Sequence, residues 1–74
     1  MPALVLYGTT HCHLCEAAEA VLSSAGVTAV YIDIADNDEL TASYGTRIPV
    51  LRRADDAAEL GWPFDAAAVR RFVA

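Results

Sequence analysis

Apolar residues along the chain alternate between short unbroken runs and runs with helical spacing. Residues 3–7 (ALVLY) form an unbroken run, which is typical of a strand buried on both faces. Further on, apolar residues recur every three or four positions, as on one face of a helix; they are Leu14, Ala17, Ala18, Val21, Leu22 and Ala25. Gly26 then suits the left-handed residue that ends many helices. Residues 28–34 (TAVYIDI) are β-branched and aromatic, so we expect a second strand, parallel to the first and reached by a right-handed connection.

The middle of the chain predicts a short helix followed by two strands. Residues 36–45 (DNDELTASYG) open with a capping-box pattern at Asp36 and contain an apolar pair one helical turn apart. Residues 47–53 (RIPVLRR) are strand-like, and Pro49 belongs at the start or the edge of that strand because it cannot donate to a ladder. Residues 54–60 predict a turn and a weak fourth strand.

The C-terminal segment predicts a final helix. Asp65 is placed to cap it, residues 66–72 form its body, and Arg70 with Arg71 would favour its C-terminal dipole. The predicted order is therefore β-α-β-α-β-β-α, and no repeat or linker interrupts it. We expect residues 1–74 to form one domain, with the tyrosines in its core: Tyr7, Tyr31 and Tyr44.

Composition and charge narrow the classes of function. The chain is 55% hydrophobic and 20% charged, which is typical of a globular domain. Its formal net charge is -5, and its five bases are all arginines that form no basic face, which argues against binding to nucleic acid or to an anionic membrane. The N-terminal apolar run is too short for a signal sequence or a membrane span. We therefore expect a cytoplasmic protein, in which a cysteine pair serves reactivity or metal binding.

Both cysteines and both histidines lie in one segment, residues 9–20 (TTHCHLCEAAEA). This segment joins the first predicted strand to the first predicted helix. A cysteine in the first turn of a helix faces unpaired N–H groups and the positive end of the dipole, which stabilise its thiolate. We therefore expect Cys12 to be the exposed nucleophile, with a pKa below the roughly 8.5 of a free thiol. Cys15, one turn further on, would be the more buried resolving thiol.

Two other interpretations of the cysteine pair compete with redox chemistry. A structural disulfide closing so small a ring would contribute about 1.9 kcal/mol, compared with about 3 kcal/mol for a fifteen-residue loop, and it would join nothing distant. Two cysteines and two histidines match the ligand count of a zinc site, but the side chains of His11, Cys12 and His13 diverge in any regular backbone. A two-thiolate site for Cu(I) or zinc remains an alternative.

The side chains around the cysteines have more ordinary explanations. His13, between the two cysteines, is a candidate for tuning the pKa of Cys12, whereas we expect His11 to be incidental. Glu16 and Glu19 suit the start of a helix and need no further role.

The motifs LYGTTHCHLCEAA, SYGTRIPVL and LGWPFDAAAVRRF together resemble the thioredoxin fold, and more narrowly a small glutaredoxin-like family known mainly from bacteria. The resemblance covers nearly the whole chain. It implies an α/β, thioredoxin-like (glutaredoxin-like) domain whose four-stranded mixed sheet has the order 2-1-3-4 and is flanked by helices on both faces.

The resemblance also implies roles for particular residues. Cys12 and Cys15 match the redox pair of this family, and Pro49 matches the cis-proline that packs opposite it. Ile48 would then offer its backbone to a bound disulfide substrate. If glutathione binds, Arg47 would take its glycyl carboxylate and Asp65 its γ-glutamyl amine; the competing interpretations are a solvated turn residue and a helix cap.

The sequence departs from common glutaredoxins in ways that bear on the reductant. The residues between the cysteines are His-Leu, no lysine precedes Cys12, and GWPFD replaces the usual glycine-rich stretch. Trp62 and Phe64 fit either an apolar lip beside the site or the core under the last helix. The reductant is therefore left open between glutathione and a reductase.

The sequence predicts a thiol–disulfide oxidoreductase that uses Cys12 and Cys15, without a bound cofactor and with glutathione as one candidate reductant. Its partners would be a disulfide-containing protein or a glutathione mixed disulfide, and a cellular thiol or reductase. We expect a monomer. The alternatives are a soft-metal carrier for Cu(I) or zinc, and a thioredoxin-fold binding module without catalysis.

Overall fold

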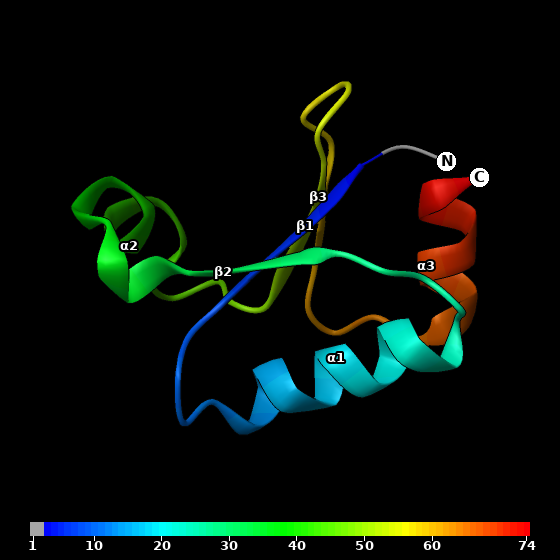
Figure 1. The fold of residues 1–74 in the computed structure, drawn as a ribbon, viewed down its shortest axis with the longest axis horizontal. Helices are drawn as coiled ribbons and strands as arrows, with labels where there is room; N and C mark the ends of the chain where they lie inside the picture. Colours follow the sequence, from blue (N-terminus) through cyan, green and yellow to red (C-terminus); the bar gives the residue numbers. More distant parts are fainter. Residues whose placement is uncertain (1–2) are drawn as a thin grey trace.

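The chain folds around a four-stranded mixed sheet, as a computed structural model that describes residues 3–74 shows (Figure 1). In chain order the elements are β1 (Leu4–Gly8), α1 (His13–Ser24), β2 (Val30–Asp33), the 3-10 helix η1 (Ile34–Asp36), α2 (Asp38–Tyr44), β3 (Val50–Arg53), β4 (Glu59–Gly61) and α3 (Ala66–Val73). The strand order is β2-β1-β3-β4, with β1 parallel to β2 and antiparallel to β3. Element order and pairing are those of the thioredoxin-like fold expected from the sequence.

The larger core lies between the sheet and the helices α1 and α3. Successive residues of a strand point to opposite faces, so Leu4 and Leu6 of β1 share one face with Leu51 of β3. Helix α1 covers this face with Ala18 and Leu22. Each fully buried aliphatic side chain contributes about 1.5 to 3 kcal/mol through the hydrophobic effect. Both faces of β1 are covered, which explains why its sequence is an unbroken apolar run.

The opposite face of the sheet carries a smaller core built with α2. Tyr7 of β1 and Val50 of β3 point to this side and pack with Tyr44, the last residue of α2. The rings of Tyr7 and Tyr44 stack with their centroids 4.5 Å apart. Figure 1 shows α2 at the left of the view and α1 and α3 along its lower and right sides. Helices therefore flank both faces, as predicted, but α2 covers only one end of its face.

The structure corrects three local predictions. Leu14 is 51% exposed because the buried stripe of α1 is centred on Cys15 and Ala18, which leaves Leu14 at its flank. Tyr31 is also exposed, because its strand β2 is an edge of the sheet. The N-cap of α2 is Asn37, whose side chain accepts a hydrogen bond from the amide of Leu40, and the predicted cap Asp36 belongs to η1.

The sheet register brings the segments of interest to one end of the fold. Tyr7 pairs with Val50 across the antiparallel β1 and β3, so the residue before β3, Pro49, lies level with Gly8. The loop that carries the cysteines leaves the same end of β1. Among residues 3–74, no helix is long and apolar enough to cross a membrane.

Candidate functional site

The two cysteines lie at the start of α1, where the loop from β1 becomes helical. Cys12 is the N-cap residue, with an extended backbone, and its sulfur accepts a hydrogen bond of 3.1 Å from the amide of Cys15. Cys12 is half-buried, whereas Cys15 is only 1% exposed. The two form a disulfide, and their Cα atoms are 5.2 Å apart. The Sγ atom of Cys12 therefore stands in for the acceptor oxygen that usually caps a helix, one position earlier than the sequence predicted.

The loop before Cys12 is fastened to the end of β2. The carboxylate of Asp33 accepts hydrogen bonds from the hydroxyls of Thr9 at 3.0 Å and Thr10 at 3.1 Å. The hydroxyl of Tyr31 donates to the carbonyl of Thr9 at 3.0 Å. The amide of Ala35 and the hydroxyl of Thr9 hold the pKa of the Asp33 carboxyl below its ordinary value. Asp33 is therefore an ionised anchor for the loop that positions the cysteines.

Gly8 leaves room between the buried cysteine and this anchor. A Cβ atom at Gly8 would lie 3.1 Å from the sulfur of Cys15 and 2.7 Å from the hydroxyl oxygen of Tyr31. Partial burial and the neighbouring Asp33 raise the pKa of Tyr31, so its hydroxyl stays protonated and keeps donating. A side chain at the last residue of β1 would therefore press on the sulfur of Cys15 and on the ring of Tyr31.

Both histidines are exposed. The side chain of His13 is fully exposed, and its Nδ1 lies 3.5 Å from a carboxylate oxygen of Glu16. His11 adopts a left-handed backbone conformation, with a φ of 57°, in the tight loop before Cys12. Within the part of the chain that the structure describes, no three histidine, cysteine or acidic side chains converge as a metal site would require. The role predicted for His13 in tuning Cys12 stays a prediction.

Pro49 lies on the same end of the sheet as the cysteine pair. The Ile48–Pro49 peptide bond is cis, as the resemblance implies, and the ring of Pro49 is fully buried. Ile48 is half-buried and packs in the core on the α2 side. The sheet register therefore places Pro49 at the end of the sheet where the cysteine loop begins, while its packing opposite the pair and the substrate contact expected of the Ile48 backbone stay predictions.

Arg47 is engaged within the protein. Its Nη2 lies 2.7 Å from Oε1 of Glu59, and its guanidinium sits over the ring of Tyr44, 5.1 Å from the centroid. The hydroxyl of Tyr44 donates a short hydrogen bond to the other oxygen of Glu59. This bond raises the pKa of Tyr44, and together with Arg47 it lowers the pKa of Glu59. Glu59 is therefore an ionised acceptor held from two sides.

Asp65 caps α3, because its Oδ1 accepts a hydrogen bond of 2.8 Å from the amide of Ala68.

The two aromatic residues of the WPFD segment pack in the protein interior, as one of their two sequence interpretations predicts. Phe64 is buried in the larger core, and the half-buried Trp62 packs on the same core, with the planes of the two rings at 77°. The peptide bond between Trp62 and Pro63 is cis. The aromatic pair thus packs on the larger core with the last helix, and a role of Trp62 as a lip beside the cysteines stays a prediction.

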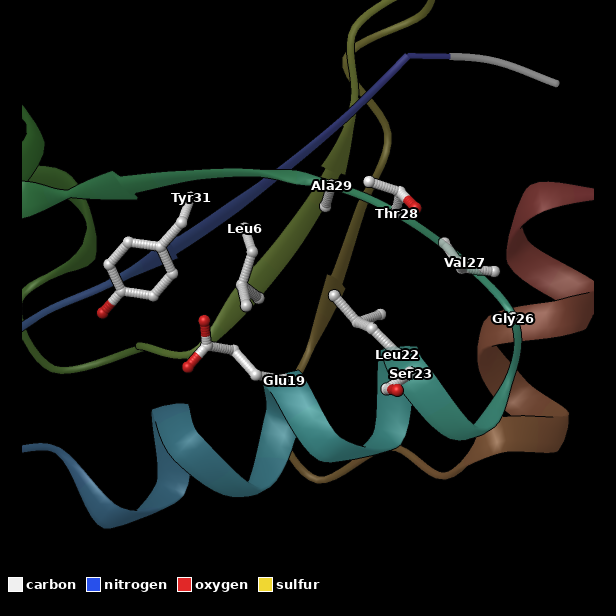
Figure 2. A pocket seen from close by; sticks show the side chains of 9 residues that line it. All are labelled: Leu6, Glu19, Leu22, Ser23, Gly26, Val27, Thr28, Ala29 and Tyr31. Carbon is white, nitrogen blue, oxygen red and sulfur yellow. The ribbon is translucent and has the colours of Figure 1, made fainter.

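A groove runs along α1, and neither cysteine lines it. It encloses about 490 Å³ between α1 and β2. Figure 2 shows Tyr31 and Glu19 at one end of this groove, and Gly26 and Val27 at the other. Tyr31 links the groove to the cysteine loop through its hydrogen bond to Thr9.

Sequence reasoning missed the anchor formed by Thr9, Thr10 and Asp33. A signal for it does exist: two hydroxyl residues follow one strand, and an aspartate ends the next, parallel strand. Because the carboxyl ends of parallel strands meet at the same edge of a sheet, these groups could have been expected to meet. The role of Gly8 could not be anticipated, since it depends on where Tyr31 points.

Comparisons with known proteins agree with this geometry. The family model of the glutaredoxin-like domain (DUF836) matches residues 3–74. The X-ray structure of protein XcR50 from X. campestris is 40% identical, with a TM-score of 0.88 over 96% of this chain and 95% of that chain. Protein Ne2328 from Nitrosomonas europaea, solved by NMR, is 29% identical, with a TM-score of 0.71 over 97% of this chain and 92% of that chain. No curated protein matches the chain.

Proposed function

This chain belongs to the glutaredoxin-like domain family, and we propose that it is a thiol–disulfide oxidoreductase that works through Cys12 and Cys15. In this family, a CxxC pair at disulfide distance supports a thiol-redox role. The observation that carries the finer proposal is the asymmetry of the pair. Cys12 is half-buried at the cap of α1, whereas Cys15 is buried beneath it. Such an arrangement suits Cys12 as the nucleophile that reacts with substrate, and Cys15 as the resolving thiol that reacts only with Cys12.

The proposed reaction proceeds in two exchanges. The Cys12 thiolate attacks one sulfur of a substrate disulfide, the S–S bond breaks, and the first substrate thiolate leaves and takes up a proton. Cys15 then loses its proton and attacks the sulfur of Cys12 in the mixed disulfide, which releases the second substrate thiol. Two electrons pass from the cysteine pair to the substrate. An external thiol or a reductase, acting on the protein disulfide, restores both thiols.

The local geometry supports both exchanges. The amide of Cys15 donates to the sulfur of Cys12 at 3.1 Å, and the positive end of the α1 dipole adds to this field. Both stabilise negative charge on Cys12 when it attacks the substrate disulfide, and again when it leaves as a thiolate while the external thiol or reductase restores the pair. The Cα separation of 5.2 Å lies within the usual range for a disulfide, so the pair can close without moving the backbone. We propose that the Ile48 backbone, beside Pro49, aligns the substrate chain.

A trapping experiment tests the proposal. Reduced Cys15→Ser protein is mixed with hydroxyethyl disulfide or with a protein disulfide, and mass spectrometry identifies adducts. We expect a stable mixed disulfide on Cys12, because the resolving thiol is gone. The matched variant, Cys12→Ser, should form little adduct, because Cys15 is 1% exposed. Absence of a Cys12 adduct would refute the mechanism, and trapping without catalytic turnover of the wild type would favour a binding module.

A further inference from the structure

Arg47 is the arginine whose backbone lies nearest in sequence to Pro49, which is level with Gly8 at the end of β1 from which the cysteine loop leaves. It is the first basic residue of the chain and lies two positions before Pro49. The backbones of Arg52 and Arg53 pair with the beginning of β1, and the guanidinium of Arg52 donates to the hydroxyl of Tyr44 at 3.3 Å. The other two arginines lie in the last turn of α3, on the far side of the fold from that loop (Figure 1).

The side chain of Arg47 is drawn away from this end of the sheet. Its partner Glu59 is opposite Arg52 in the β3–β4 ladder, whereas Val50, next to Pro49, is opposite Gly61. Two strand residues separate these levels, which is about 7 Å along the sheet. The guanidinium therefore lies along the α2 face of the sheet and not at the cysteines.

Tyr44 and Glu59 hold the guanidinium in this position together. The ion pair between Arg47 and Glu59 is 2.7 Å long, and the side chain of Glu59 is only 27% exposed. Tyr44, which is buried and stacked on Tyr7, supplies the ring beneath the guanidinium and a hydroxyl bond to Glu59. Because the Tyr44 hydroxyl holds the Glu59 carboxylate in place, this carboxylate competes more strongly for the guanidinium of Arg47 than a freely solvated carboxylate does.

We infer that Glu59 determines substrate specificity by withholding Arg47 from the redox pair, so that the site takes neutral and protein disulfides in preference to glutathione disulfide. This inference rests on the proposed thiol–disulfide exchange and on the same two-electron step. Glutathione disulfide carries more carboxylates than ammonium groups and needs a cation to hold it. Near the pair it meets instead the carboxylate of Glu16 in the first turn of α1.

The test compares two small disulfides as oxidants of the fully reduced protein. Second-order rate constants are measured with glutathione disulfide and with hydroxyethyl disulfide, which has no carboxylate, by acid quenching, alkylation and mass spectrometry of the remaining thiols. The ratio of the two constants cancels changes in thiol reactivity. Glu59→Gln keeps an acceptor for Tyr44 but releases Arg47, and should raise the ratio about fivefold, which corresponds to one exposed arginine–carboxylate contact.

A double-mutant cycle assigns the gain to the guanidinium. Arg47→Gln alone should change the ratio less than about twofold, and Arg47→Gln combined with Glu59→Gln should return it to the wild-type value. Asp56→Asn is the matched control. It removes the same charge from the Arg53–Asp56 ion pair, which is 2.6 Å long and lies in the turn between β3 and β4, and it should leave the ratio unchanged.

Three outcomes overturn the inference. Arg47→Gln alone could lower the ratio severalfold, which would mean that Arg47 already binds glutathione. The gain of Glu59→Gln could persist without Arg47, which would make it a general effect of charge. The ratio could also stay constant in Glu59→Gln protein that still reacts with hydroxyethyl disulfide. If the wild type reacts with neither disulfide nor with a protein disulfide, the proposed function itself fails.

Discussion

Replacing Gly8 by alanine tests the close packing between β1, the buried cysteine and Tyr31. The added Cβ would lie 2.7 Å from the Tyr31 hydroxyl oxygen and 3.1 Å from the Cys15 sulfur, whereas ordinary contacts begin at 3.4 Å. The hydroxyl must therefore retreat by about 0.7 Å and the sulfur by about 0.3 Å. Tyr31 can turn toward solvent, but it then loses its hydrogen bond to Thr9. Cys15 is 1% exposed and has no free space to enter.

These displacements set the expected magnitude. A lost hydrogen bond costs about 0.5 to 1.5 kcal/mol, and overpacking a filled site costs about 1 to 3 kcal/mol. We expect Gly8→Ala to lower the free energy of unfolding by about 1 to 3 kcal/mol. In a domain of this size each kcal/mol shifts the melting temperature by roughly 4 to 8 °C. The melting temperature should therefore fall by roughly 4 to 24 °C.

Urea and thermal unfolding followed by circular dichroism measure the effect, and Gly61→Ala is the matched control. Gly61 also lies in a strand, but a Cβ atom there meets nothing within 4 Å. The control should be neutral or slightly stabilising, since alanine restricts the unfolded chain more than glycine does. Tyr31→Phe added to Gly8→Ala should recover part of the loss. Equal stability of the Gly8→Ala and Gly61→Ala proteins would refute the packing argument.

Three further predictions concern the caps and charges of the site. Asp65→Ala should destabilise the protein by about 0.5 to 2 kcal/mol in urea unfolding, whereas Asp65→Asn keeps the cap of α3. An equal loss of stability in the two variants would mean that the charge of Asp65 matters and not its role as a cap. Because hydrogen bonds hold the pKa of Asp33 below its ordinary 3.8, its stabilising contribution is present above that pH and is lost as pH falls below it. Unfolding curves of Asp33→Asn should therefore depend less on pH in that acidic range, and an unchanged dependence would contradict the anchoring role. The Cys12 thiol should titrate below the roughly 8.5 of a free cysteine in a thiolate absorbance titration of the reduced protein. Protein purified without chelator should carry less than one equivalent of zinc or Cu(I); a full equivalent bound to both thiols would support the metal-carrier alternative instead.

Much of the fold was predictable because its elements depend on local patterns. The unbroken apolar run of β1 and the helical spacing before Gly26 each specify an element and the side it buries. Asp65 was also predictable as a cap, since a short acceptor before a helix satisfies amides of the first turn. The residues at which helices and strands begin and end were harder to predict. Asp36 and Asn37 are both good caps, and only the preceding 3-10 helix decides that Asn37 starts α2.

The candidate site likewise contains features that were predictable from the sequence and features that were not. The spacing of Cys12 and Cys15 at a strand–helix junction already predicts an accessible and a buried thiol, because helix geometry places them on one side a turn apart. The ion pair of Arg47 was not predictable. Its partner Glu59 is twelve residues away in sequence, and only the pairing of β3 with β4 brings the two together.

The sequence by itself determined the order of elements, the parallel first pair of strands, and the redox pair at the start of α1. These features follow from periodicity, capping and spacing, which act over a few residues. The tertiary structure alone decided that Asp33 anchors the cysteine loop, that Gly8 must lack a side chain, and that Glu59 holds Arg47. Each of these depends on which side chains the sheet register places within a few ångströms, and such contacts between distant residues leave no local pattern in the chain.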